Sequence, residues 1–455
     1  MSGSSIRNPG RDESMRLFAL CGIGALLIAL TALAPWLFDS ANWSPFIVIM
    51  IVSGFVAMAA TWIAVGVPER TGLLIVVGVA VVLRVIALLP EPLLSSDIYR
   101  YVWDGRVQAA GMNPYRYIPV DPALAALRDT AIYPNINRAD YAHTAYPPVA
   151  EYFFFAATRL GDSVLAMRLA FIGCEIAIAF MLLSILRTLE RPATYIIAYL
   201  WHPLAVWEIA NAGHVDGLLV TLVVAAIWFL LRGKGIYGAA VVALAVLVKP
   251  YAAVMLPAFW KPWDWRAPAI VLAVIALCYL PYLGVGSAVF GFIPGYLKEE
   301  GLQGGASFWL VRMANLVFSD LALLRGAYFG IAIVTLGSLA FWIAYRSSQL
   351  EPERQIRDVA LLLMAGLFFL SPNYPWYYLV LVPLIPLGAG APAWVLTISG
   401  MTLHLFWPEN YDVRINIWKS IISVGFLAAL FVDYTAFGQR LVRTHSEMNS
   451  PGKGS

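Results

Sequence analysis

Residues 72–90 read GLLIVVGVAVVLRVIALLP, an apolar run long enough to cross a bilayer as one helix. A span needs about 20 apolar residues, and it must be helical because lipid cannot hydrogen-bond to bare backbone groups. Directly after it, residues 91–148 form the longest polar interruption of the chain, rich in Tyr, Asp, Arg and Pro. This boundary predicts an all-α polytopic membrane protein with one large loop.

The composition supports the membrane class. Hydrophobic residues make up 61% and charged residues 13% of the chain, against about 25% charged in a soluble domain. The 16 Trp and 22 Tyr suit rings at membrane interfaces. The net charge of +3 gives no indication of nucleic-acid binding. The three cysteines, Cys21, Cys174 and Cys278, lie in apolar runs, which predicts buried side chains and no disulfide framework.

Fourteen apolar stretches are candidate spans, and two fewer remain possible because several are short or broken near Pro250, Pro375 and Pro392. They lie near 17–38, 45–67, 72–90, 164–187, 193–209, 214–231, 236–249, 251–262, 267–284, 326–345, 358–371, 376–388, 392–407 and 415–437. The first is too long for a cleavable signal and lacks a small-residue cleavage site. We expect a single domain of 12–14 transmembrane helices over 15–440, flanked by cytoplasmic tails 1–14 and 441–455 with disordered ends.

Positive charges predict the orientation, because cytoplasmic loops are enriched in Lys and Arg. With fourteen spans, one side receives Arg7, Arg11, Arg16, Arg187, Arg191, Arg232, Lys234, Lys261, Arg266, Arg346, Arg354, Arg357, Arg440 and Arg443. The other side receives 39–44, 91–163, 208–214, 285–325, 371–375 and 408–414, with Lys298, Arg312, Arg325 and Arg414 as the minority. Residues 91–163 are therefore expected to face away from the cytoplasm.

The sequence SSDIYRYVWDGRVQAAGMNPYRYIP at 95–119 predicts a helix along the outer interface. Ser95 or Ser96 can cap it, and GMNPY at 111–115 ends it with a glycine and a turn. Helical spacing places Asp97, Arg100, Tyr101, Asp104 and Gln108 on one face, opposite Ile98, Val102 and Val107. A purely structural interpretation stays open, in which Asp97 caps the helix and Asp104 pairs with Arg100 or Arg106.

Further polar and aromatic residues recur at the same expected membrane depth. They stand in YPPVAEYF (146–153), in WHPLAVWEIANAGHVDG (201–217, with Glu208, Asn211, His214 and Asp216), at Lys249-Pro250, and in SPNYPWYY (371–378). Each has a structural alternative: His202 and His214 as hydrogen-bonded structural residues, Lys249 as a snorkelling cation, Trp376 and Tyr377 as an aromatic belt. Their convergence favours a site, because ionisable groups at membrane depth are costly.

The ordered motifs resemble the GT-C superfamily of membrane glycosyltransferases, and within it the polyprenol-phosphate-mannose-dependent mannosyltransferases of the DUF2029 / family-87 kind. The resemblance rests on Asp97 and Tyr99, Gly111 to Tyr115, Tyr-Pro-Pro at 146–148, Gly-His-x-Asp at 213–216, Lys-Pro at 249–250 and Ser-Pro…Pro-Trp-Tyr at 371–377. It covers about residues 17–437. The hairpin 17–67 departs from the family by preceding its usual first span.

The resemblance implies a GT-C-like bundle, a polyprenyl-phosphate sugar donor, most plausibly of mannose, and a lipid or glycan acceptor at the membrane. It implies a catalytic Asp97, with Asp104 as the runner-up, in an inverting displacement. The expected donor-binding residues are Arg100, Tyr101, Arg106, Asn113, Tyr115, Tyr146, His214, Asp216, Lys249, Tyr374 and Trp376. No cofactor is implied with certainty; a divalent metal stays possible, although 91–148 lacks a DxD pair.

Two other classes are considered. A transporter or flippase would explain the broken helices, but it predicts polar groups at the midplane and inverted repeats, and no repeat is evident. A structural membrane protein would not require Asp, His, Lys and Tyr to gather on one side. The enzyme is the favoured interpretation.

Overall fold

The computed structural model describes residues 9–305, 307–318, 320–346, 351–406 and 411–448. Throughout these ranges the regular structure is helical, apart from one isolated β-bridge between Asp39 and Asn42. Seven helical stretches are long and apolar enough to cross a membrane: Glu13–Leu37, Ser44–Ala64, Glu69–Leu88, Val164–Thr188, Arg266–Glu299, Leu321–Arg346 and Arg414–Asp433. The all-α polytopic fold is therefore confirmed.

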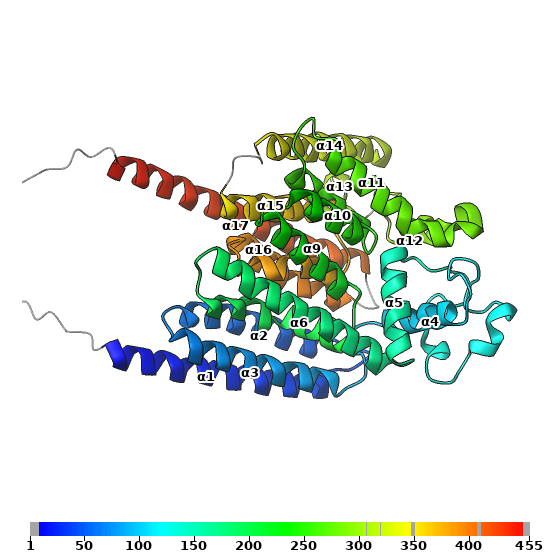
Figure 1. Cartoon of the computed structure of the whole chain (residues 1–455), viewed down its shortest axis with the longest axis horizontal. Coiled ribbons are helices and arrows are strands. Elements are labelled where there is room, and N and C mark those ends of the chain that lie inside the picture. The colour runs from blue at the N-terminus through cyan, green and yellow to red at the C-terminus, as the bar shows by residue number, and fades with distance from the viewer. Residues whose placement is uncertain (1–8, 306, 319, 347–350, 407–410, 449–455) are drawn as a thin grey trace, which may run out of the picture.

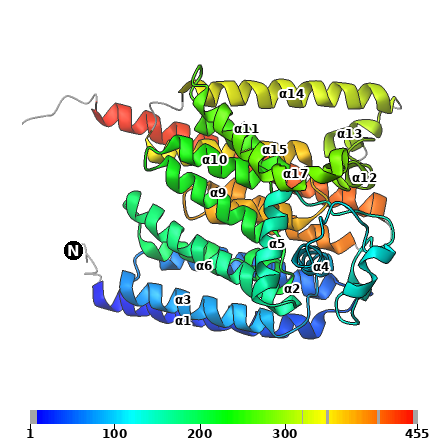
Figure 2. The same cartoon turned by 45° about the vertical axis from the view of Figure 1, so that its right-hand side comes forward.

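Two layers of helices build the bundle (Figure 1). Helix α1 (Pro9–Leu33) packs against α2 (Ser44–Ala64) and α3 (Glu69–Leu88) in the lower layer of that view. Helix α6 (Val164–Thr188) lies above them and contacts α9 (Asp216–Leu230). The turned view in Figure 2 keeps α1 and α3 together, with α6 between them and α9.

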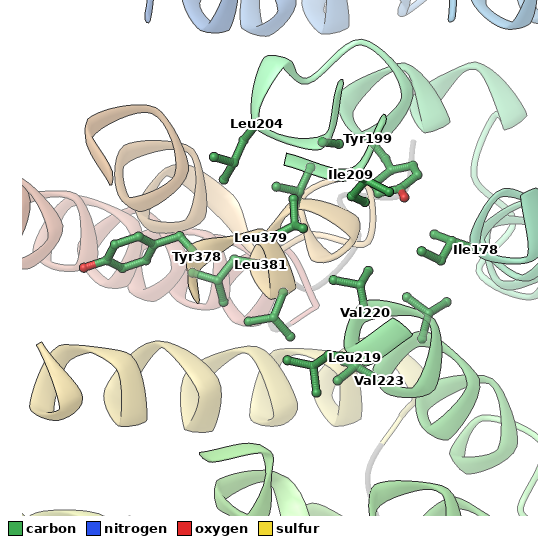
Figure 3. Packing of buried hydrophobic residues seen from close by; sticks show 14 of the residues in the cluster. Ile178, Tyr199, Leu204, Ile209, Leu219, Val220, Val223, Tyr378, Leu379 and Leu381 are labelled. Carbon is green, nitrogen blue, oxygen red and sulfur yellow. The ribbon is translucent and has the colours of Figure 1, made fainter. Parts of the chain in front are cut away.

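The upper layer continues from α9 through α10 (Gly235–Val246), α11 (Arg266–Tyr279), α14 (Leu321–Arg346) and α15 (Pro352–Leu370) to α16 (Gly390–Gly400) and α17 (Tyr411–Met448). The layers meet in an apolar core. Figure 3 shows part of this core, with Leu219, Val220 and Val223 of α9 and Leu379 and Leu381 of the segment that begins at Pro375. Burying aliphatic side chains at about 25 cal/mol per Å² stabilises this core.

Several predicted spans are not continuous α-helices. The expected span 193–209 is four short pieces, η4 (Ala193–Ile196), α7 (Ile197–Leu200), α8 (Pro203–Ala205) and the π-helix η5 (Val206–Asn211). The expected spans 251–262 and 376–388 correspond to the tight helices η6 (Pro250–Phe259) and η9 (Pro375–Leu384). A proline at the first helical position needs no backbone partner, so Pro250 and Pro375 can start these helices. The residues just before them, Lys249 and Tyr374, stay extended.

The large loop gathers at one end of the bundle. Helices α4 (Asp97–Ala109), α5 (Pro148–Leu160) and α12 (Ile293–Glu299) lie there, whereas α1 begins and α17 ends at the opposite end (Figure 1). Helix α1 begins at Pro9 and α17 continues to Met448, so both helices reach into the ranges expected for the tails, whose cytoplasmic assignment stays a prediction. Residues 1–8 and 449–455 lie outside the described part.

Helix α4 begins at Asp97 as predicted, but it does not lie open along an interface. Its expected polar face is buried together with its apolar one, since Arg100, Tyr101 and Asp104 are at most 4% exposed. The cause is close packing on α5 at Gly105, where a Cβ would stand 2.4 Å from the Phe154 carbonyl oxygen. The loop is thus a packed part of the fold and can hold side chains rigidly.

Candidate active site

A cavity of about 860 Å³ opens where the loop meets the ends of the bundle helices. Its walls come from Trp43 and from residues within 92–101, 135–147, 248–251, 292–302, 370–377 and 403–404. Pockets of this size and mixed lining hold drug-sized or larger ligands. Seven separate chain segments therefore converge on one site, four of which carry the motifs noted in the sequence.

Asp97 stands at the cavity wall as the first residue of α4. Its backbone N–H donates to the Ser95 hydroxyl at 3.1 Å, while Ser96 occupies the N-cap position without a side-chain cap bond. The Asn137 amide donates to Oδ1 of Asp97 at 2.6 Å. The side chain is half-buried. Asp97 therefore offers a carboxylate oxygen to a ligand at a fixed place in the cavity wall.

Three cations line the same cavity, and each is fixed by a carboxylate. Lys249 Nζ lies 2.7 Å from Asp216 Oδ2 and 4.5 Å from the centre of the Tyr377 ring. Arg138 Nε lies 2.7 Å from Glu299 Oε2, joining the loop to α12. Arg100 Nε lies 2.8 Å from Asp104 Oδ1. These cations are oriented before any ligand arrives, as electrostatic catalysis requires.

The expected site residues divide into two groups. Those that line the cavity are Asp97, Arg100, Tyr101, Tyr146, Lys249, Tyr374 and Trp376. Those outside its lining are Asp104, Arg106, Asn113, Tyr115, His214 and Asp216. Most of the second group contacts residues of the first; Arg106 does not.

Asp104 and Glu151 form a buried carboxyl pair behind Arg100. Burial raises the pKa of Asp104, and Arg100 acts against that rise. Burial and the neighbouring Asp104 raise the pKa of Glu151 well above its usual range. Glu151 accepts from the Thr144 hydroxyl at 2.6 Å and from the Gln108 amide at 2.9 Å. We expect the pair to hold a proton, since two like charges this close are costly.

Arg106 lies outside the cavity lining and joins α4 to other parts of the loop. It bonds to Asp162 at 2.9 Å and Asp129 at 2.8 Å, and it donates to the Leu127 carbonyl at 3.0 Å. Slight burial acts to raise the pKa of Asp129, but hydrogen bonds from Arg106 and two backbone N–H groups lower it to about 2. The structure gives Arg106 a role in ordering the loop.

The predicted turn at 111–115 supports Tyr146. Gly111 takes φ +78°, which only glycine adopts readily, and Asn113 Oδ1 accepts the Tyr115 N–H at 3.0 Å. The Tyr115 hydroxyl then donates to the Tyr146 carbonyl at 2.7 Å. Tyr146 in turn lies edge-on to the Tyr101 ring, 5.0 Å between centroids, at the cavity wall.

Three expected aromatic and histidine residues form one stack. Trp376 lies between Tyr374, at 4.4 Å, and His214, at 4.2 Å, as measured between ring centroids. Both faces of the indole are therefore covered by other rings. His202 lies apart from this stack and outside the cavity lining; its ring bonds to Thr397 and to the Leu204 N–H.

Several cavity residues were not singled out from the sequence. They include Trp43, Asn137, Arg138, Tyr251, Tyr296, Glu299, Glu300 and His404. The Glu300 carboxylate accepts from the Tyr374 hydroxyl at 3.0 Å and from the Asn373 amide at 2.8 Å. The sequence pattern did not identify Asn137 and Arg138, because they lie in an irregular loop without helical periodicity. His404, an ionisable residue in an apolar run, did carry a usable signal.

Among the described residues, no group of three or more His, Cys, Asp or Glu side chains could hold a metal ion.

Comparison with known proteins identifies the family of this chain. A family model described as MptA_B_family, alpha-(1->6)-mannopyranosyltransferase, N-terminal domain, matches residues 18–263, more than half of the chain. The chain is 25% identical over 354 residues to alpha-(1->6)-mannopyranosyltransferase A of Mycobacterium tuberculosis (strain ATCC 25618 / H37Rv). That match covers 68% of this chain and 66% of the relative, just under two thirds of its length. No solved structure matches the chain.

Proposed function

Because this chain belongs to the MptA_B family of alpha-(1->6)-mannopyranosyltransferases, we propose that it is a membrane mannosyltransferase that uses a polyprenyl-phosphate sugar. The observation that carries the proposal is the cavity at the loop end, where Asp97 and the fixed cation Lys249 line one space. A transferase needs a base for the acceptor and positive charge for the leaving phosphate. Both kinds of group are present in that cavity.

The proposed reaction is a single displacement. The acceptor hydroxyl oxygen attacks the anomeric carbon, its proton passes to Asp97, and the bond from that carbon to the phosphate oxygen breaks. Polyprenyl phosphate leaves with the electron pair, so the anomeric centre inverts. Lys249 stabilises the growing charge on the phosphate, and Arg100 and Arg138 add positive charge around the cavity. A phosphate is already a good leaving group, so the step requires no general acid.

We place the cavity on the extracytoplasmic side. The positive clusters of the sequence predict a cytoplasmic position for both termini. Helix α1 begins and α17 ends at the end of the bundle opposite the large loop, whose residues line the cavity (Figure 1). A donor whose lipid remains in the bilayer would present its phosphate at the membrane boundary, which is the depth expected for Asp97. The acceptor is proposed to be a membrane-associated glycan or glycolipid.

The test is transfer by the Asp97→Asn variant with radiolabelled polyprenyl-phosphate mannose in membranes. The variant should insert and fold normally and should lose transfer by at least about 100-fold, the usual size of a general-base contribution. Asp140→Asn is the matched control, because Asp140 is an exposed carboxylate of the same loop outside the cavity lining. Normal transfer by Asp97→Asn would overturn the assignment of the base. Donor that crosses the membrane unconsumed would instead favour a flippase.

A further inference from the structure

His404 lines the same cavity and is held by a fully buried carboxylate. Its Nε2 lies 2.7 Å from Oε1 of Glu208, whose side chain is completely inaccessible. Glu208 comes from the π-helix η5, and His404 comes from η10 (Met401–Phe406). π-helical turns in proteins are often found at functional sites. The fold thus breaks two predicted spans to bring these side chains together.

The carboxylate selects one form of the imidazole. Glu208 accepts a hydrogen bond, so Nε2 of His404 carries the proton and Nδ1 is left as a hydrogen-bond acceptor. The same relationship orients the histidine of a catalytic triad. The second oxygen of Glu208 lies 3.2 Å from Nε2 of His214, behind Trp376. His404 is therefore a rigid acceptor at the cavity wall.

Two indoles lie beside this acceptor. The ring centroids of Trp43 and Trp376 are 5.8 and 6.1 Å from that of His404. The indole nitrogen of Trp43 is buried and does not face the cavity, so Trp43 offers apolar ring surface there. A hydrogen-bond acceptor beside apolar ring surface suits an uncharged polyol.

We propose that His404, Glu208 and Trp43 form a subsite for the hydroxyl groups of a hexose ring. Nδ1 of His404 accepts from one hydroxyl, the Trp43 ring packs against the apolar face of the sugar, and Glu208 is a positioning residue. The negative charge of Glu208 disfavours a phosphate here, which leaves the phosphate to Lys249. This inference rests on the proposed function, in which the cavity binds two sugars: the mannose of the donor and that of the acceptor.

The experiment measures KM for each sugar separately with purified protein. Polyprenyl-phosphate mannose serves as donor and octyl α-D-mannopyranoside as acceptor, and hydrolysis of the donor without acceptor is measured as well. His404→Ala should raise one KM by about 10-fold, as for the loss of one hydrogen bond, and Trp43→Ala should raise the same KM because it removes the ring surface. If the donor mannose fills the subsite, donor hydrolysis falls too; if the acceptor fills it, hydrolysis and donor KM stay at the wild-type value.

Glu208→Gln tests the positioning role. A glutamine amide can donate to Nε2, which moves the ring proton to Nδ1 and turns the acceptor into a donor. This variant should reproduce the KM increase of His404→Ala although it preserves the volume of the side chain. Wild-type KM in Glu208→Gln would exclude the positioning role. Glu190→Gln is the control, because Glu190 is exposed and lies outside the cavity lining.

Folding is checked by size-exclusion profile and thermal midpoint for every variant. Unchanged KM for both sugars in folded His404→Ala would overturn the subsite. Failure of the proposed function is distinguishable by calorimetric titration with octyl α-D-mannopyranoside alone. A wild-type protein that consumes no donor yet binds the mannoside through His404 would refute the transferase and retain the subsite. A wild-type protein that binds no mannoside and consumes no donor would overturn both.

Discussion

Lys249 Nζ lies 2.7 Å from Asp216 Oδ2, so a cation just before η6 is held by the first residue of α9. Lys249 lines the cavity, whereas Asp216 lies outside the cavity lining. The ring of Tyr377 covers Lys249 at 4.5 Å. This arrangement fixes the ammonium group in advance and presents it toward the ligand space, as a leaving phosphate would need.

Lys249→Gln should therefore reduce kcat/KM for mannose transfer by about 10²- to 10³-fold, the usual loss when a group that stabilises developing charge is removed. Lys249→Arg should retain part of the activity, since it keeps the charge but not the shape. Lys234→Gln is the control, because Lys234 is exposed and does not line the cavity. Initial rates with radiolabelled donor give the answer. A fall of less than threefold in Lys249→Gln would remove Lys249 from the donor site.

The sequence predicted the helical membrane fold because an apolar run of span length has few alternatives in lipid. It predicted the start of α4 at Asp97, since a serine just before residues at helical spacing is a local signal of a helix N-terminus. It also placed Lys249 and Trp376 near Asp97, through membrane depth alone. Membrane depth does not determine where a residue lies within the plane of the membrane, because that position depends on how the helices pack.

The errors have physical causes as well. The polar face of α4 looked exposed, yet Arg100 and Asp104 neutralise each other and can be buried with α5. The span 193–209 was expected to be continuous because most of its residues are apolar. Pro203 within it is a helix-breaking residue, and short helical pieces can be buried as well as one long helix. Asn137 was missed because a loop residue acquires its partner, Asp97, only through tertiary contact.

The second prediction concerns Glu151 and the pH dependence of the stability of the fold. Burial and Asp104 hold its pKa well above the unfolded-chain value of about 4.3. A raised folded-state pKa adds stability that is complete below the unfolded-state pKa and is lost as the pH rises through the folded-state pKa. The wild-type thermal midpoint should therefore fall between pH 5 and pH 8 partly because of this pair.

Glu151→Gln removes the titrating group and keeps an oxygen for Thr144. Its thermal midpoint should fall less over the same pH interval than that of the wild type, as measured in detergent by differential scanning fluorimetry. Glu190→Gln, at an exposed turn, should behave as the wild type. An equal pH dependence in Glu151→Gln and wild type would show that the pair does not hold a proton.

The third prediction concerns Gly105 and the close contact between α4 and α5. A Cβ at this position would meet the Phe154 carbonyl at 2.4 Å and the Thr158 side chain at 2.6 Å, so α4 and α5 would have to separate. Overpacking of this kind costs about 1–3 kcal/mol, and it would also displace Asp97 and Arg100. Gly105→Ala should lower both the thermal midpoint and the transfer rate.

Gly78→Ala is the matched control for that substitution. Gly78 lies in α3 with nothing within 4 Å of an added Cβ. Alanine is favoured over glycine inside a helix by about 0.5–1 kcal/mol, so this variant should be as stable as the wild type or slightly more stable. If Gly105→Ala behaved like Gly78→Ala, the close α4–α5 contact would not be required for the site.

The last prediction concerns the buried pair of Arg84 and Glu175. Arg84 Nη2 lies 2.7 Å from Glu175 Oε1, and Arg84 also donates to the Leu200 carbonyl, so the pair ties α3 and α6 to the broken segment at α7. Glu175→Leu leaves a buried cation without its counter-charge and should destabilise the fold by about 3–5 kcal/mol. Adding Arg84→Met should recover most of that loss, leaving a deficit of about 1–3 kcal/mol for the unpaired Leu200 carbonyl. Thermal midpoints of the two single variants and the double variant form the cycle that measures the coupling. Additive losses would mean that the two charges stabilise the fold independently, and the tie between α3 and α6 would then have to come from apolar packing alone.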